Sequence, residues 1–190
     1  MKISILSILG FLFLSCWNFH ENKSEITLKE RPLKSIIDSA GIDSKSLRIS
    51  IVKSKYELSV WSGKIKLKTY PVVFGPNPVD DKLRQGDMCT PEGMFKIKSK
   101  YPHASWSKFM WIDYPNAASW KKHNEAKQKG IIPADAKIGG DVGIHGVPKG
   151  CDYAIDQRQN WTFGCISLKN KDVNEIYEVV SVNTVVEIKK

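Results

Sequence analysis

From Leu47 onward, apolar and polar residues alternate with a period of two, and this pattern restricts the chain to a fold built on β-sheet. Residues 47–51 alternate in a first run, residues 58–60 in a second, and residues 65–74 in a third that follows the hairpin-type turn Ser62-Gly63-Lys64. Successive side chains of a strand point to opposite faces, so each run buries one face. Three such runs joined by short turns predict neighbouring antiparallel strands.

The remainder of the chain adds short strands and a few helices. Further strands are expected at residues 94–97, 107–114, 142–145 and 185–188. Residues 119–129 are polar and predict a surface helix or a loop. We therefore expect a mainly β fold with two or three helices packed against the sheets, and the length of 190 residues favours one folded domain.

Two apolar stripes at helical spacing predict the helices that cover the sheet. The first follows Pro32 and ends at Gly41, and the second follows Asn170, a residue type suited to an N-cap. The residues expected to be buried on the first helix are Leu33, Ile36, Ile37 and Ala40. Those expected on the second are Val173, Ile176, Tyr177 and Val180.

The N-terminus resembles an export signal that ends in a lipid-modified cysteine. Lys2 supplies a positive start, residues 3–14 form an apolar run too short to cross a bilayer comfortably, and Ser15 precedes Cys16. The sequence F-L-S-C is similar to the lipobox of bacterial lipoproteins, although Phe13 stands where that pattern usually has Leu. An ordinary secretory signal and an uncleaved N-terminal anchor are the alternatives.

These features divide the chain into three parts. We expect residues 1–15 to be a signal peptide, residues 16–46 to be a tether with a short helix, and residues 47–190 to be the folded domain. Lipid on Cys16 would hold the protein at the periplasmic face of a bacterial membrane, whereas an ordinary signal would release it into the periplasm.

The formal net charge of +9 suits an anionic polymer or a membrane surface, although a solvated basic surface without a special partner is the simpler explanation. No nucleic-acid-binding module is recognisable in the sequence, and export also argues against nucleic acid as a partner. The sequence does not indicate an oligomeric state.

Export also changes how the other cysteines are interpreted. Cys89, Cys151 and Cys165 would lie in an oxidising compartment, where exposed thiols tend to pair. Three is an odd number, so at least one thiol stays free unless the protein dimerises. Cys89 and Cys151 are either bridged to each other or are small buried residues.

One His and one Cys, each beside glycine, form the chemically most informative pattern of the chain. His145 lies in the sequence G-I-H-G, and Cys165 lies in T-F-G-C. A cysteine attacks a carbonyl as a thiolate, and a neighbouring imidazole is the usual proton acceptor. The pattern therefore predicts a cysteine acyl-transfer site. The alternatives are a buried structural Cys165, a buried structural His145, and a zinc site, although the spacings of His145, Cys151 and Cys165 fit no zinc motif.

With these motifs the chain resembles the L,D-transpeptidase catalytic domain (YkuD-type) family. His145-Gly146 and Thr162-Phe163-Gly164-Cys165 occupy the positions of the family signature, and residues 86–95 (G-D-M-C-T-P-E-G-M-F) resemble its G-D-x-x-T-P-x-G-x-F segment. The resemblance extends over about residues 47–188 and implies a mixed β-sandwich with peripheral helices. The chain departs from many members at Phe163, where they have a second His, and at Ser167, where they have Arg.

The resemblance implies an enzyme that acts on peptidoglycan stem peptides through a thioester on Cys165, without metal or cofactor. Its implied catalytic residues are Cys165 as nucleophile, His145 as general acid and base, and Gly164 as a backbone donor of the oxyanion hole. Its implied substrate-binding residues are Gly146, Trp161, Thr162 and Ser167. Attack by an amine gives transpeptidation, which cross-links or remodels the cell wall.

Three points remain open at this stage. Attack by water would instead make the protein an L,D-carboxypeptidase or a hydrolase, and a protein that keeps the fold without catalysis would be a wall-binding lipoprotein. Residues 90–93 either shape a wall of the site or form a turn that leads into a strand. The aromatic residues Trp106, Trp111, Tyr114 and Trp120 either line a groove or belong to the core.

Overall fold

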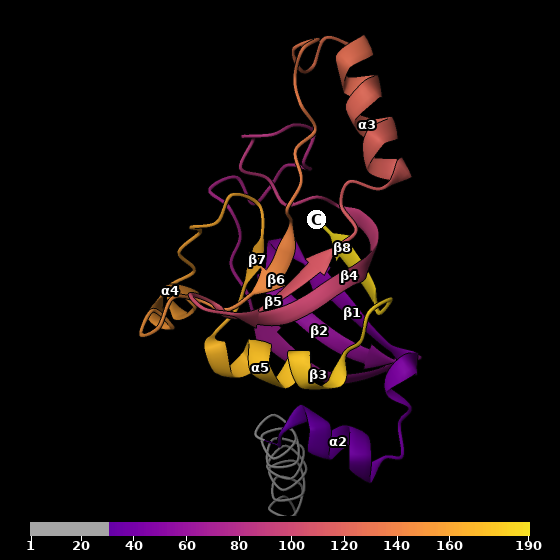
Figure 1. Cartoon of the computed structure of the whole chain (residues 1–190), viewed down its shortest axis with the longest axis vertical. Helices are drawn as coiled ribbons and strands as arrows, with labels where there is room; N and C mark the ends of the chain where they lie inside the picture. The colour runs from indigo at the N-terminus through magenta and orange to yellow at the C-terminus, as the bar shows by residue number, and fades with distance from the viewer. Residues whose placement is uncertain (1–30) are drawn as a thin grey trace, which may run out of the picture. The chain divides into compact units, whose positions relative to one another are not determined.

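Eight strands form one mixed sheet, and the last strand of the chain lies in its middle (Figure 1). The computed structural model describes residues 31–190, and residues Leu33–Lys190 form one compact unit. The strands are β1 (Leu47–Val52), β2 (Glu57–Ser62), β3 (Ile65–Pro71), β4 (Gly93–His103), β5 (Ser107–Ile112), β6 (Gly143–His145), β7 (Ile166–Ser167) and β8 (Val185–Lys189). Their order in the sheet is β3-β2-β1-β8-β4-β5-β6-β7.

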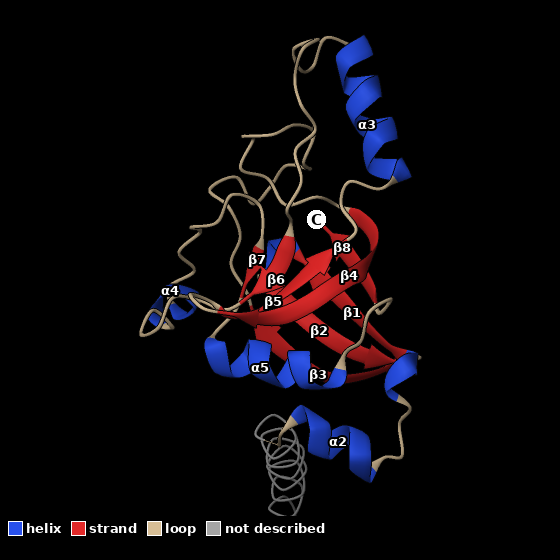
Figure 2. Ribbon diagram, in the orientation of Figure 1, coloured by secondary structure: helices blue, strands red, loops and turns tan. Residues whose placement is uncertain are grey.

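The sheet curls at β4, the longest strand (Figure 2). Residues Gly93–Lys96 of β4 pair with β8, the rest of the strand pairs with β5, and the register shifts between Ile97 and Ser99. A bulge of this kind bends a strand and increases its twist. The bend lets both ends of the sheet contribute to one core, in which Ile49 of β1 and Ile144 of β6 are fully buried. The expected mainly β fold is confirmed.

Four α-helices lie within residues 31–190, one or two more than expected. They are α2 (Leu33–Ser39), α3 (Ala117–Gln128), α4 (Tyr153–Asp156) and α5 (Asn170–Val179), and two 3₁₀ turns, η1 (Ser44–Ser46) and η2 (Lys53–Lys55), flank β1. Helix α5 packs on β5 and β6, and α2 packs on α5 and β3 (Figure 1). Leu33 and Ile37 of α2 enter the main core. Helix α4 is a single turn, too short to show a helical period in the sequence.

The ends of several elements differ from the expectation. Helix α2 stops at Ser39, so Ala40 is exposed rather than buried. The N-cap position of α5 is Lys169 and not Asn170, whose side chain points inward toward Gly146. The expected signal peptide and Cys16 lie outside the described residues. No helix between residues 31 and 190 is long and apolar enough to cross a membrane.

Candidate active site

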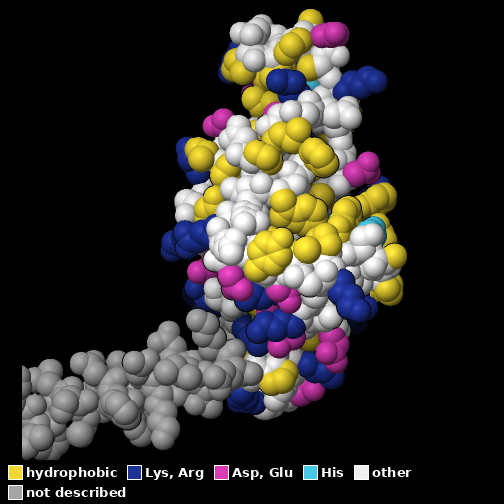
Figure 3. All heavy atoms as spheres, turned by 90° about the vertical axis from the view of Figure 1, so that its left-hand side faces the viewer, with side chains coloured by type: hydrophobic (Ala, Val, Ile, Leu, Met, Phe, Trp, Pro, Cys, Tyr) yellow, Lys and Arg dark blue, Asp and Glu magenta, His cyan; other side chains and the backbone are white. Residues whose placement is uncertain are grey.

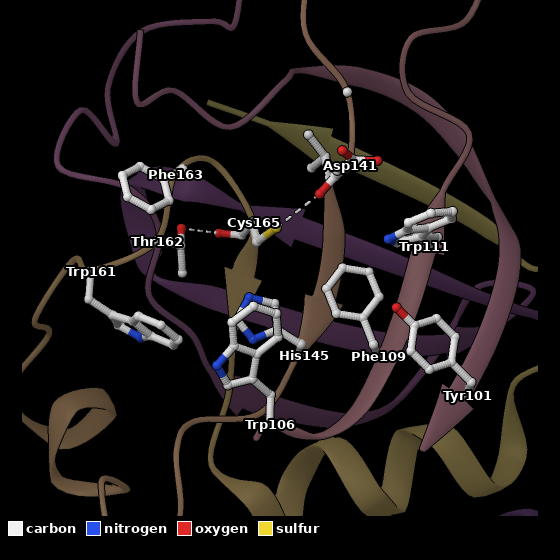
Figure 4. A pocket seen from close by; sticks show the side chains of 12 residues that line it. Tyr101, Trp106, Phe109, Trp111, Asp141, His145, Trp161, Thr162, Phe163 and Cys165 are labelled. Atoms are coloured by element: carbon white, nitrogen blue, oxygen red, sulfur yellow. Dashed lines mark hydrogen bonds between the residues drawn. The ribbon is translucent and has the colours of Figure 1, made fainter. Parts of the chain in front are cut away.

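A cavity of about 440 Å³ opens beside the edge of the sheet formed by β5, β6 and β7 (Figure 4). Aromatic side chains form most of its wall, and both His145 and Cys165 contribute to it. The lining residues are Tyr101, Trp106, Phe109, Trp111, Gly140, Asp141, Val142, His145, Trp161, Thr162, Phe163 and Cys165.

The parallel pairing of β6 with β7 brings the imidazole and the thiol to this cavity. Ile144 pairs with Ile166, and His145 pairs with Ser167. The two isoleucines are fully buried, so they fix both strands in the core while His145 ends β6 and Cys165 directly precedes β7. Residues that are 20 positions apart in the sequence therefore face one cavity, as the motif predicts.

The His145 ring is held between aromatic neighbours and carries its proton on Nδ1. Nδ1 donates to the carbonyl of Gly146 at 2.7 Å, which leaves the Nε2 lone pair as the free acceptor. The ring stacks on Trp106 at 4.5 Å between centroids and on Phe109 at 5.5 Å. Burial lowers the pKa of His145 to about 4, so the imidazole is neutral near pH 7 and able to accept a proton.

Cys165 is a neutral thiol in this structure. Burial raises its pKa to about 11, and the nearby Asp141 adds to the rise, while the Gly143 N–H and the Lys82 ammonium oppose it. The Cys165 thiol donates to the Asp141 carbonyl at 3.4 Å (Figure 4). No hydrogen bond joins its sulfur to His145 in the described chain, and burial favours the neutral form of both groups.

A hydrogen-bonded turn holds Cys165 in place. The Thr162 hydroxyl donates to the Cys165 carbonyl at 2.7 Å and accepts from the Gly164 N–H at 3.2 Å. Gly164 has a φ of +127°, and a Cβ there would lie 2.5 Å from the Cys89 carbonyl oxygen, so only glycine fits. Thr162, which also lines the cavity as expected of a substrate-binding residue, thus holds the turn by hydrogen bonds.

This turn changes the prediction for the oxyanion hole. The Gly164 N–H is already engaged by Thr162, so Gly164 contributes conformation rather than a free donor. Within residues 31–190 the Cys165 N–H has no hydrogen-bond acceptor, and it is the backbone donor left beside the thiol.

The loop at residues 75–92 packs against the turn that holds Cys165. Cys89, which contacts Gly164 through its carbonyl, is tied to Asp87, and Asp87 forms an ion pair with the buried Lys82 at 2.8 Å. Burial alone would raise the pKa of Asp87, but hydrogen bonds from the Arg84 N–H and from Lys82 outweigh it and lower the pKa. The carboxylate therefore stays charged and keeps the loop closed.

The described cysteines are not bridged, because Cys89, Cys151 and Cys165 are all free thiols. Cys89 is buried, and Cys151 is half-buried. Across residues 31–190 no three His, Cys, Asp or Glu side chains converge as metal ligands would.

Two of the expected substrate-binding residues lie behind the imidazole instead of in the cavity. Ser167 is fully buried and donates to the Gly146 carbonyl at 3.3 Å, the same oxygen that receives the Nδ1 proton of His145. A Cβ on Gly146 would meet Asn170 and would lie 2.6 Å from the Trp106 carbonyl oxygen. Gly146 therefore allows close packing of protein segments and not the approach of a substrate.

The aromatic residues divide between the cavity and other places. Trp106, Trp111 and Trp161 line the cavity, as one reading of the sequence expected, whereas Tyr114 is buried in the core and Trp120 lies on α3. Residues 90–93 do not line the cavity, and Thr90 is fully buried, so they form the turn into β4.

Sequence reasoning did not identify Tyr101, Phe109 or Asp141. Phe109 could have been found as an inward position of the predicted strand 107–114, but Tyr101 lies on the part of β4 that was not predicted. Asp141 lies in a loop without any periodic pattern, and its one signal is the Gly139-Gly140 pair before it.

The chain matches the model of a known protein family over most of its folded domain. The model of the L,D-transpeptidase catalytic domain (YkuD) matches residues 46–188, and the chain belongs to this family. No curated protein sequence matches the chain at a significant level.

Solved structures of similar fold come from several bacteria. The helical cell shape determining protein Pgp2 from Campylobacter jejuni has a TM-score of 0.58 and 22% identity, with 76% of this chain and 48% of that chain covered. Bd1075 from Bdellovibrio bacteriovorus has a TM-score of 0.53 and 17% identity, with 75% and 47% covered. An L,D-transpeptidase from Mycobacterium smegmatis has a TM-score of 0.52 and 14% identity, with 76% and 59% covered. At these identities the likeness concerns the fold, and the chain spans about half the length of these proteins.

Proposed function

We propose that this protein is a cysteine acyl-transferase of peptidoglycan stem peptides, an L,D-transpeptidase. The observation that carries the proposal is the convergence of the Cys165 thiol and the neutral His145 imidazole on one aromatic cavity, with Nε2 left free by the bond from Nδ1 to Gly146. A buried neutral base beside a thiol and a free backbone donor are the groups that acyl transfer needs.

The first half-reaction forms a thioester. The Cys165 thiol turns from the Asp141 carbonyl toward His145 and gives its proton to Nε2, and the sulfur forms a bond to the peptide carbonyl carbon. The Cys165 N–H donates to the oxygen that becomes negative. The imidazolium then returns the proton to the leaving nitrogen, the C–N bond breaks, and the terminal D-amino acid departs.

The second half-reaction releases the acyl group. An amine of a second stem attacks the thioester carbon, its proton passes to Nε2, and the Cys165 sulfur leaves and recovers the proton from the imidazolium. Water in place of the amine gives a shortened stem, which is the L,D-carboxypeptidase alternative.

The test is incubation of the purified protein with a disaccharide-tetrapeptide, followed by mass spectrometry. A cross-linked dimer formed with loss of a D-amino acid supports the transpeptidase. A tripeptide without dimer reassigns the protein as a carboxypeptidase.

A Cys165→Ala variant is the matched control. Product from this variant would contradict a thioester on Cys165. If the native protein is inactive on stem peptides and on intact sacculi but binds sacculi equally well with and without Cys165, the protein is a wall-binding module instead.

We also propose that the protein is held at the periplasmic face of the cell envelope by lipid on Cys16. The lipobox-like sequence F-L-S-C supports this location, where peptidoglycan is accessible. Incorporation of labelled fatty acid into the native chain, and its loss in Cys16→Ala, would test the anchor. The similar fold of Pgp2, a helical cell shape determining protein, makes cell shape a readout worth measuring in a deletion strain.

A further inference from the structure

Asp141 is the one charged side chain that the described part of the chain places on the wall of the cavity. The other lining side chains are aromatic, apolar or neutral, and none is Lys or Arg. Among residues 31–190 its carboxylate takes part in no ion pair. A substrate group that contacts this wall therefore meets a negative charge that no other side chain of the wall neutralises.

The backbone fixes this carboxylate beside the reacting sulfur. Asp141 has a φ of +57°, a left-handed conformation that is uncommon outside glycine and that Asp tolerates better than most residues. In this conformation its carbonyl accepts from the Cys165 thiol at 3.4 Å, while its carboxylate lies at the rim of the cavity (Figure 4). One residue thus touches the nucleophile with its backbone and faces solvent with its charge.

Aromatic faces lie on the same side of the cavity. Figure 4 shows Trp111 and Tyr101 on the side of the cavity where Asp141 lies, and the two rings meet edge to face at 6.5 Å between centroids. A carboxylate attracts an ammonium group by its charge, and the electron-rich faces of neighbouring aromatic rings attract it as well. The same arrangement repels a carboxylate.

The surroundings direct a polymeric substrate toward this rim. Figure 3 shows hydrophobic side chains gathered across the middle of the face that carries β7 and its neighbouring loops, with charged side chains mostly around the edges. Phe163, beside Cys165, is 80% exposed and belongs to the cavity wall. An extended peptide with one positive group fits such a surface.

We propose that Asp141, with the neighbouring Trp111 and Tyr101, binds the side-chain ammonium group of the acceptor stem peptide. The inference rests on the proposed transpeptidase function, whose second substrate is an amine, and assigns the recognition of that amine to Asp141. The bound ammonium loses one proton to solvent, and the neutral amine forms the new C–N bond. Its second proton goes to Nε2 of His145 and then to the departing Cys165 sulfur as the C–S bond breaks.

The binding test uses the native protein and a stem tripeptide that ends in a diamino acid. The tripeptide has no terminal D-residue to release, so binding is measured by titration calorimetry without turnover. It is compared with the same peptide acetylated on the side-chain amine. We expect the free amine to bind about five-fold more tightly, as for an exposed charge pair of about 1 kcal/mol. The preference should weaken as salt is added.

The decisive comparison is Asp141→Asn, which keeps the shape and tolerates the left-handed backbone but removes the charge. We expect this variant to bind both peptides equally. The matched control is Asp135→Asn, an exposed carboxylate of the same loop, which should keep the five-fold preference. An unchanged preference in Asp141→Asn, a lost preference in Asp135→Asn, or no preference in the native protein would overturn the proposal.

A second measurement separates this inference from the proposed function. With a tetrapeptide donor and the tripeptide acceptor, Asp141→Asn should lower the ratio of cross-linked to hydrolysed product about five-fold relative to the native protein. An unchanged ratio overturns the role of Asp141. If the native protein forms no product but still prefers the free amine by calorimetry, the ammonium site stands and the transpeptidase assignment fails.

Discussion

His145 is buried and Cys165 is half-buried, and this loss of solvent moves their pKa values in opposite directions. The pKa of the Cys165 thiol is about 11 and the pKa of the His145 imidazole is about 4. Between these two pH values both groups are therefore mostly uncharged. A thiolate–imidazolium pair, which is common among cysteine nucleophiles, does not form at rest. In the proposed reaction Cys165 would therefore lose its proton only when a substrate is present.

The raised pKa of Cys165 predicts how the thiol reacts with a small uncharged reagent. Below its pKa a thiol gains about ten-fold in thiolate fraction for each pH unit. We expect alkylation of Cys165 by iodoacetamide to rise about ten-fold per unit from pH 7 to 10, measured by peptide mass spectrometry. A rate that is already flat from pH 6 would show a preformed ion pair.

Gly146 gives a second prediction for a single residue. A methyl group at this position must displace either the Asn170 side chain or the Trp106 backbone, so Gly146→Ala should lower the free energy of unfolding by about 1–3 kcal/mol. Urea denaturation measures this loss. Gly140→Ala is the control, because no atom lies within 4 Å of its added Cβ, and a loss of the same size there would refute the packing argument.

The turn at residues 162–165 depends for its geometry on the hydroxyl of Thr162. Thr162→Val removes two hydrogen bonds and should destabilise the protein by about 1–3 kcal/mol. Because the turn sets the position of Cys165, release of the D-amino acid should also slow by about 10- to 100-fold. Thr162→Ser keeps the hydroxyl and should stay near the native values. Equal effects of the two substitutions would assign the loss to packing.

At the scale of elements the sequence predicted strands better than caps and turns. The alternation at residues 47–51 predicted β1 because β1 buries mostly one face, but β4 extends beyond residue 97 through a bulge that breaks the alternation. Asn is a residue type that often caps the N-terminus of a helix, but the Asn170 side chain packs toward Gly146 instead. The Thr162 bond to Gly164 also depends on φ angles that residue types alone do not specify.

At the scale of the whole molecule the site depends on strands that are far apart in the sequence. The motif predicted that His145 and Cys165 meet, because both motifs carry an apolar residue that seats a strand in the core. It could not predict Tyr101 or Asp141, which reach the cavity only through the curl of the sheet and a loop conformation. Residues without a periodic signal are placed by tertiary structure.

The stability of the whole fold should depend on strand β8. It pairs with β1 on one side and with β4 on the other, so a chain that ends at Asn183 loses both connections. We expect such a chain to show no cooperative thermal unfolding in circular dichroism. A chain that lacks only Lys190 should unfold like the native protein. A sharp transition in the shorter chain would mean that the two halves of the sheet fold without their shared strand.

The central position of β8 in the sheet also determines when, during synthesis, the fold can be completed. During synthesis β1 to β7 are made before the strand that joins them, so Cys165 has already been made when β8 is still to come. Because the sheet closes only when β8 has paired with β1 and β4, we expect a nascent chain that stops before β8 to lack the finished arrangement of His145 and Cys165. The geometry that brings His145 and Cys165 to one cavity is therefore complete only after β8 has been made and has paired with both halves of the sheet.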